Sequence, residues 1–214
     1  RKYEKDDKEA HMQLSINLYR KNKYGLMNKS ITLYDKKYGV DSNIDLNEYM
    51  KANALLKRSI EKLDNNLRKS AIAYYQKLAD RTQDYSLKRA INMYLIDYYI
   101  DQENHVNTIQ IAKKLYVTSR SNFDTETTEK AAEAILHGLA MLSQSDKVKT
   151  FLNDESVKKL IPKQTLLAYL TYSYLKIGDV KNVIRLYDKH KKRLGPSVHH
   201  SLLFNFGEAL FRSA

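Results

Sequence analysis

LAYLTYSYLKIGDVKNVIRLY, residues Leu167–Tyr187, contains two amphipathic runs with helical spacing, joined by a Gly178–Asp179 turn, and a partial second copy begins near Leu203. Two helices joined by a short turn form a helical hairpin. A single hairpin cannot bury its apolar faces, so repeated hairpins stack on their neighbours and build a solenoid. The stretch therefore predicts a stack of helical hairpins.

The composition favours helices throughout the chain. Of its 214 residues, 43% are hydrophobic and 29% are charged, which is the ordinary range for a folded protein. Only two prolines and six glycines interrupt the sequence. Because proline and glycine are the main breakers of helices, we expect an all-α fold, a superhelical stack of antiparallel helix pairs with about eleven helices.

Local signals mark several helix ends. Asp45 followed by Glu48 has the spacing of a capping box, in which each side chain satisfies amide donors where a helix opens. The helix expected over 146–160 lies in the least regular part of the sequence, and we expect it to be short or broken around Asn153–Asp154. Gly195–Pro196 is expected to end one helix and to start the last one.

Small residues recur at Gly138, Thr171 and Gly207, which are 33 and 36 residues apart. They occupy the position at which two helices of a pair approach each other. The clearest unit sets Thr171 among Leu167, Leu170, Tyr174, Gly178, Asp179, Val183 and Tyr187, with Pro196 further on. This pattern resembles the tetratricopeptide repeat (TPR), whose consensus has an aromatic residue, Leu-Gly, Tyr, a Gly-Asp type of turn, Ala and a second aromatic residue.

The resemblance covers residues 85–214 and implies TPR-like repeats there, truncated at the C-terminus, within one continuous solenoid. A weaker unit places Leu95, Ile96 and Tyr99 in the same columns. Residues 1–84 contain helical hairpins without the motif, and we interpret them as degenerate repeats or as an N-terminal cap. We also expect the natural chain to continue beyond Ala214, and its start at Arg1 to reflect an excerpt or a processed form.

In tetratricopeptide repeats, first-helix positions beside the packing stripe face a ligand in the concave surface of the stack. The chaperone-binding members of the family use lysine and asparagine there to clamp a terminal carboxylate, whereas this chain has other residues, so we expect no such clamp. Carried over residue by residue, the resemblance implies partner-binding roles for Met93, Asp97, Ala168, Tyr172, Lys176, Phe204, Glu208 and Phe211.

Three aromatic residues in that set, Tyr172, Phe204 and Phe211, would suit an apolar or aromatic peptide, because aromatic anchors dominate binding energy in desolvated pockets. The alternative is that these rings pack against neighbouring helices. Tyrosine is common in this chain, with 17 copies, and in helices it is often a half-buried spacer.

The chain is basic, with a formal net charge of +12. A run that we call the basic ridge contains Lys181, Arg185, Lys189, Lys192 and Arg193. Such a ridge attracts acidic protein, anionic lipid or nucleic acid, but it is also typical of a solvated helix face. Aromatic platforms between the cations, which single-strand binders use, are not evident.

Catalytic and cofactor-binding patterns are absent from the sequence. It has no cysteine and contains none of the motifs GxxxxGK[ST], GxGxxG, HExxH or GxSxG. His199 and His200 are adjacent and diverge by about 100° on a helix, so they cannot readily share a metal. We interpret His137 as a packing histidine, and Asp97 with Asp101 as a solvated pair. We therefore expect a protein that is not an enzyme and has no cofactor or metal.

No stretch reaches the ~18 consecutive apolar residues of a membrane span. We expect a non-enzymatic scaffold or adaptor for protein–protein interaction, in a larger multi-protein assembly; analogy suggests a bacterial envelope, secretion or motility machine. One alternative is a basic helical-repeat protein that binds nucleic acid, and another is a peptide receptor for apolar or aromatic segments. The sequence leaves the oligomeric state open, and the compartment open between cytoplasm and periplasm.

Overall fold

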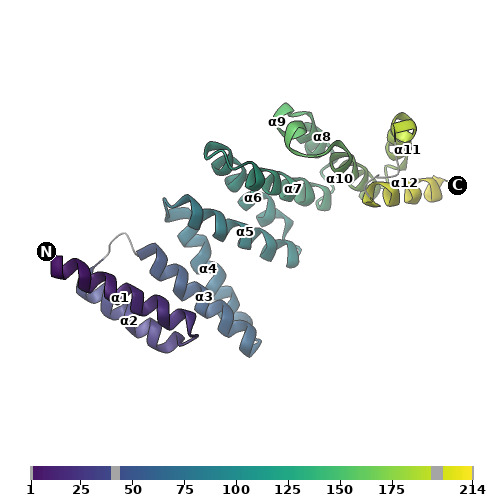
Figure 1. Ribbon diagram of the computed structural model, residues 1–214. Helices are drawn as coiled ribbons and strands as arrows, with labels where there is room; N and C mark the ends of the chain where they lie inside the picture. The colour runs from purple at the N-terminus through teal and green to yellow at the C-terminus, as the bar shows by residue number, and fades with distance from the viewer. Residues whose placement is uncertain (1, 40–43, 194–199, 214) are drawn as a thin grey trace. The chain divides into compact units, whose positions relative to one another are not determined.

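All regular structure in the computed structural model is helical over the ranges that it describes, which are residues 2–39, 44–193 and 200–213 (Figure 1). Twelve α-helices and one short 3-10 turn lie in these ranges. The prediction of an all-α fold with about eleven helices is confirmed. The helix expected over 146–160 is indeed broken, because Asp154 ends one helix and caps the next by accepting from Ser156 N at 2.8 Å.

The chain divides into two units, residues 1–91 and 92–214, and the division falls within α5 (Tyr85–Asp101). The first unit contains α1 (Lys2–Arg20), α2 (Tyr24–Tyr38), α3 (Ile44–Lys62) and α4 (Asn65–Arg81). Here α1 packs on α2 and α3 packs on α4, while α3 also contacts α1 and α2 (Figure 1). The core of α1 to α3 is made of Met12, Tyr24, Met27, Ile31, Tyr34, Met50 and Ala54.

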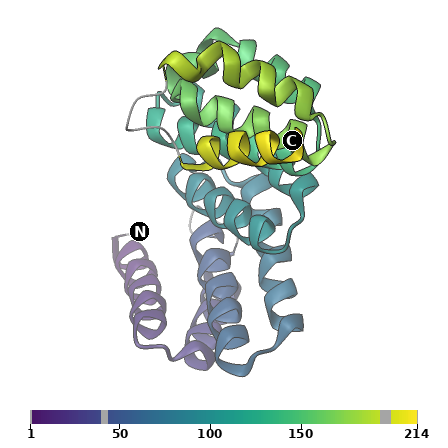
Figure 2. The same cartoon turned by 90° about the vertical axis from the view of Figure 1, so that its right-hand side faces the viewer.

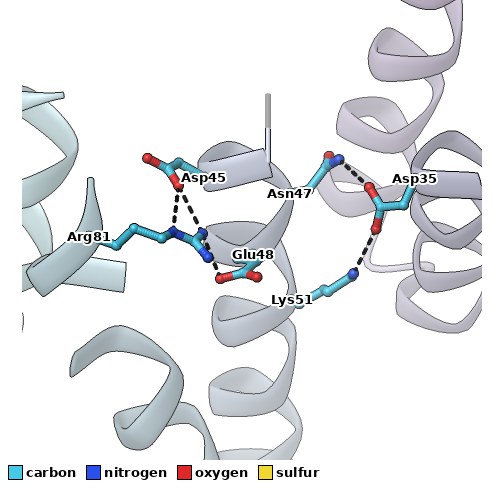
Figure 3. Close-up of polar contacts among 6 residues, drawn as sticks. All are labelled: Asp35, Asp45, Asn47, Glu48, Lys51 and Arg81. Atoms are coloured by element: carbon cyan, nitrogen blue, oxygen red, sulfur yellow. Dashed lines mark hydrogen bonds and ion pairs between the residues drawn. The ribbon is translucent and has the colours of Figure 1, made fainter. Parts of the chain in front are cut away.

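Polar contacts join the helices of this unit at its surface (Figure 3). On α2, Asp35 accepts from Asn47 Nδ2 and pairs with Lys51 Nζ, each at 3.3 Å. Arg81, at the end of α4, donates to Asp45 Oδ1 at 2.8 Å and to Glu48 Oε2 at 2.9 Å. The predicted capping box is wrong: Asp45 lies inside the first turn of α3, and both carboxylates pair with the guanidinium of Arg81 instead.

The second unit follows a repeating pattern of neighbours. Its helices after α5 are α6 (His105–Ser121), α7 (Thr125–Met141), α8 (Ser145–Asn153), α9 (Glu155–Leu160), α10 (Lys163–Lys176), α11 (Val180–His190), the 3-10 turn (Lys191–Arg193) and α12 (His200–Ser213). The helices α7, α10 and α12 pack side by side in that order, and α8 and α11 each contact the two members of this row that flank them (Figures 1 and 2). Each helix thus packs on its nearest neighbours, which is compatible with a helical solenoid.

Short turns of one conformation connect most of the helices. The residue before each cap has a positive φ of 52° to 75°, and these residues are Asn22, Leu63, Glu103, Phe123, Ser143 and Gly178. In four of these turns the residue after the positive φ is the N-cap of the following helix. Its side chain accepts a hydrogen bond from a backbone N–H of the first turn, and these caps are Asp64, Asn104, Asp124 and Asp179. The Gly178–Asp179 turn seen in the sequence is one of this series. Gly195–Pro196, the other predicted break, lies outside the described residues.

Gly138 allows a close approach of two helices, but not of the pair expected. A Cβ atom at this position would lie 2.5 Å from Ile109 Cγ1 and 3.2 Å from the carbonyl oxygen of His105, both on α6. Gly138 therefore allows α7 to pack closely on α6, the preceding helix. The sequence pattern predicted that it would allow a close approach to the following helix instead. A Cβ atom on Gly207 of α12 would meet nothing within 4 Å.

Candidate functional site

Two adjoining pockets lie in the second unit. The first has a volume of about 340 Å³ and opens between α7, α10 and α12. Its walls are mostly apolar, and none of the described residues that line it is a lysine, an arginine or an acidic residue. The lining residues are His137, Ala140, Met141, Thr165, Ala168, Tyr169, Tyr172, Ser201 and Asn205.

The second pocket, of about 400 Å³, lies between the end of α5, α7 and α10. It combines aliphatic walls with charged side chains. The lining residues are Met93, Ile96, Asp97, Ile100, Lys130, Glu133, Ala134, His137 and Tyr169. Because His137 and Tyr169 line both pockets, we treat the two as one site and call them the unit 2 groove.

The lining positions repeat along the chain with one spacing. On α5 they are 93, 96, 97 and 100, on α7 they begin with 130, 133, 134 and 137, and on α10 they are 165, 168, 169 and 172. Each set follows the i, i+3, i+4, i+7 rule for one face of a helix. The sets start at 93, 130 and 165, and α12 joins at 201, so the steps are 37, 35 and 36 residues. The groove is thus a periodic feature of the fold.

Aromatic rings form the wall between the pockets. The ring centroid of His137 lies 6.4 Å from that of Tyr169 on α10 and 5.8 Å from that of His105 on α6, both edge to face. Burial lowers the pKa of His137, with a smaller effect from His105, so its imidazole is neutral near neutral pH. Burial raises the pKa of the Tyr169 hydroxyl, and the carboxylate of Glu133 adds to this shift.

The charged residues among the described lining border the second pocket. Asp97 is exposed, but the surrounding walls withdraw water from it and raise its pKa, Asp101 one turn away adds to this shift, and Lys130 opposes it. Asp97 forms no hydrogen bond or ion pair with any residue of the described ranges. Lys130, the one lysine among the described lining residues, pairs with Glu126 at 2.6 Å and also acts on Asp97 through its charge. The described lining of this pocket thus has two carboxylates, Asp97 and Glu133, for one lysine.

Hydrogen bonds hold the floor of the first pocket. Asn205, which is buried, donates to the carbonyl oxygen of Ala168 and to the hydroxyl of Thr171, each at 2.9 Å. Tyr172 donates to the sulfur of Met141 at 3.3 Å, and Lys176 Nζ donates to the carbonyl oxygen of the same methionine at 3.3 Å. These contacts tie α12 to α10 and α10 to α7, which fixes the walls relative to one another.

Four of the predicted partner-binding residues line the groove, namely Met93, Asp97, Ala168 and Tyr172, and Lys176 lies at its edge. The three predicted residues of α12 are placed outside it. Phe204 and Phe211 point to solvent with 70% and 81% of their surface exposed, and Glu208 pairs with Arg212 at 2.8 Å. Ser201 and Asn205 face the groove instead, because the hydrogen bonds of Asn205 turn that face of α12 toward α10.

Sequence reasoning assigned no groove residue to α7, although that helix contributes the most. Its lining residues are Lys130, Glu133, Ala134, His137, Ala140 and Met141. The signal that could have found them is the step of 35 to 37 residues between lining sets. It was hidden because Gly138 had been aligned with Thr171, 33 residues later, whereas Gly138 packs against α6.

The basic ridge is a second surface feature of this unit. Lys181, Arg185 and Lys189 are exposed at a spacing of four on α11, and Lys192 is exposed on the 3-10 turn that follows. None of these four forms an ion pair within the described ranges. The neighbouring Lys191 pairs with Asp188 at 2.7 Å. The side chain of Arg193, the fifth predicted member, lies outside the described part of the structure.

Within the described ranges, no group of three or more histidine, cysteine or acidic residues is arranged to hold a metal ion. No helix in those ranges is both long enough and apolar enough to cross a membrane. His199, one of the two adjacent histidines, lies outside the ranges. Comparisons with protein-family models, with curated proteins and with solved structures gave no match for this chain.

Proposed function

We propose that this protein is a non-enzymatic scaffold or adaptor of the TPR type, which holds a segment of another protein in the unit 2 groove. The observation that supports it is the periodic lining of the groove. The helices α5, α7 and α10, which are separated in the chain by other helices, present the same i, i+3, i+4, i+7 face, and these faces together line two adjoining pockets. A row of equivalent helix faces offers a rigid and extended binding surface.

The pockets suit side chains of a protein segment. Volumes of about 340 and 400 Å³ leave room for one or two side chains each, and most of the lining is apolar or aromatic. The walls stand on helices that are tied together by the hydrogen bonds of Asn205 and Tyr172. A binding surface that is already ordered loses little entropy when it binds, which favours affinity.

We propose binding rather than catalysis because the described residues of the groove offer no activated nucleophile. His137 is the only histidine among the described lining residues of the two pockets. Its contacts are with the rings of His105 and Tyr169, and it forms no hydrogen bond to a described hydroxyl or carboxylate. A general base needs such a contact with its nucleophile. A place in a larger multi-protein assembly, by analogy a bacterial envelope machine, is the setting that we propose for this adaptor.

Affinity capture from lysate of the native source, with bound proteins identified by mass spectrometry, tests this function. The variant Tyr172→Ala removes a groove wall, and Phe204→Ala removes an exposed ring outside the groove. We expect specific partners on the wild type and on Phe204→Ala, and their loss on Tyr172→Ala with unchanged circular dichroism. Loss of the partners on Phe204→Ala and their retention on Tyr172→Ala would instead indicate that the partner binds the outer face of α12.

A second candidate function, binding of nucleic acid through the basic ridge, is favoured by one observation. Four exposed cations lie along α11 and the turn after it without an ion pair in the described ranges. Titration of labelled oligonucleotides should then show binding that weakens steeply with salt. The triple variant Lys181→Gln, Arg185→Gln and Lys189→Gln should lose it, whereas Lys113→Gln, Lys147→Gln and Lys159→Gln, with the same change in charge, should not. Equal losses would indicate only a general effect of net charge.

A further inference from the structure

On the basis of the proposed function, we propose that the unit 2 groove binds a protein segment that carries a lysine or arginine side chain next to an apolar one. The cation lies against Asp97 in the second pocket, and the apolar side chain enters the first pocket beside Tyr172. The two pockets differ in charge, and this difference is what defines the partner.

The described lining of the second pocket has a formal charge opposite in sign to that of the whole chain. The formal net charge of the protein is +12, whereas the described lining has two carboxylates, Asp97 and Glu133, and one lysine, Lys130. Lys130 pairs with Glu126 at 2.6 Å, and its charge also acts on Asp97. A positive side chain that enters here is attracted, whereas a carboxylate would be repelled.

Asp97 is the residue best placed to receive that cation. It is exposed in the pocket and makes no hydrogen bond or ion pair with the described residues. The groove walls and Asp101 raise its pKa, and the charge of Lys130 offsets part of this effect. A cation bound against Asp97 would favour its ionised form and would form a charge-assisted hydrogen bond.

None of the described residues that line the first pocket is charged, and Lys176 lies at its edge with Nζ 5.9 Å from the centroid of the Tyr172 ring. Ala140, Met141, Ala168 and Tyr172 supply apolar surface, and His137 is neutral near neutral pH because its pKa is lowered. An aliphatic or aromatic side chain gains free energy by leaving water for this surface, whereas a charged group would lose its hydration without a counter-ion. The ring pair of His137 and Tyr169 separates the two pockets. A segment that fills both must therefore pass across these rings.

Fluorescence anisotropy with synthetic peptides tests the inference. The probes are short Gly/Ser peptides that carry one arginine and one phenylalanine at a series of separations. Matched series replace the arginine by neutral citrulline or by glutamate, or the phenylalanine by serine. We expect the arginine and phenylalanine series to bind best at one separation, and more weakly as salt is raised. Replacement of either side chain should cost about tenfold in affinity.

Variants of the protein test whether the peptide binds in the unit 2 groove. Asp97→Asn keeps the shape of the side chain and removes its charge, and we expect it to weaken binding of the arginine peptide about tenfold but to leave the citrulline peptide unchanged. Asp146→Asn is the matched control, because this aspartate lies on α8 with a side chain 94% exposed and outside both pockets. Tyr172→Ala should weaken both peptides.

This experiment distinguishes an error in the predicted preference for a cation from an error in the proposed function. If the citrulline or glutamate series binds as tightly as the arginine series and still depends on Tyr172, the groove is a binding site but its preference for a cation is wrong. Equal effects of Asp97→Asn and Asp146→Asn would also overturn that preference. If no series shows binding that depends on Tyr172, both the cationic preference and the peptide-binding groove are refuted.

Discussion

The imidazole of His137 and the phenol of Tyr169 meet edge to face, with ring centroids 6.4 Å apart and planes at 83°. One ring comes from α7 and the other from α10, so the contact sets the separation of two helices that line the unit 2 groove. Both side chains border both pockets. The ring pair is thus a packing contact and a part of the binding surface at once.

Protonation of His137 is predicted to destabilise the protein in acid. Its folded-state pKa is below the ordinary value of 6.5, so the unfolded chain takes up the proton more readily. The contribution of His137 to stability is then fully present above pH 6.5 and falls as the pH drops from there through the folded pKa. Unfolding in urea, followed by circular dichroism from about pH 7.5 to about pH 5, should show a larger loss for the wild type than for His137→Gln.

The groups that face His137 are the same in the variant, which makes it a fair comparison. These are His105 on α6, Tyr169 on α10 and the other charged residues of the second pocket, Asp97, Lys130 and Glu133. Two stability curves that run parallel over this range of pH would show that His137 does not contribute to the acid sensitivity.

Gly138 is predicted to be intolerant of any side chain. In Gly138→Ala the new methyl group would lie 2.5 Å from Ile109 Cγ1, so either the Ile109 side chain must shift or α6 and α7 must move apart. Overpacking of this kind costs about 1–3 kcal/mol, and better helix propensity returns about 1 kcal/mol, so we expect a net loss of about 1 kcal/mol. Urea unfolding measures the loss.

The companion change Ile109→Ala identifies the cause. It removes the atoms that the new methyl group would meet, so Gly138→Ala should cost little or become stabilising in that background. This coupling is the interaction term of a double-mutant cycle. An equal cost of Gly138→Ala in both backgrounds would assign the loss to the nearby carbonyl oxygen of His105 instead.

Local features of the sequence were sufficient to predict most of the fold. The Gly178–Asp179 turn was predicted because glycine accepts a positive φ and aspartate caps the next helix, and both occur here. The break at Asn153–Asp154 followed from irregular spacing. The capping box at Asp45 failed, because the same carboxylate can also pair with Arg81, a residue 36 positions away that local spacing does not reveal.

The groove could be predicted only in part. Met93, Asp97, Ala168 and Tyr172 were found because α5 and α10 follow the same helical register. The contribution of α7 was missed, since small residues such as Gly138 do not say which neighbouring helix they approach. On α12, Phe204 lies one residue from Asn205, and a buried amide with two hydrogen bonds decided which of the two faces inward. The spacing of apolar residues does not predict such tertiary contacts.

Asn205 is predicted to hold α12 on α10. Its amide donates to Ala168 O and to Thr171 Oγ1, each at 2.9 Å, in a buried site. Asn205→Ala removes the donor and leaves two buried acceptors with fewer bonds, which should cost about 1–3 kcal/mol in unfolding free energy. In the Thr171→Val background one of these acceptors is already gone, so the further loss should be smaller by about 1 kcal/mol. Additive losses would show that Asn205 acts through packing rather than through Thr171.

Phe123 is predicted to cost stability where it stands. It occupies the turn between α6 and α7 with a φ of 55°, and 94% of its surface is exposed. A side chain in this left-handed conformation is strained by about 1 kcal/mol, and the exposed ring has almost no packing to lose. Phe123→Gly should therefore raise the free energy of unfolding by about 1 kcal/mol, whereas Phe123→Ala, which keeps the Cβ atom, should leave it nearly unchanged.

Gly178→Ala is the converse control. Gly178 has a φ of 75° in the same kind of turn, so this variant should lose a similar amount of unfolding free energy. A gain in Phe123→Ala equal to that in Phe123→Gly would assign the effect to the exposed ring and not to the backbone.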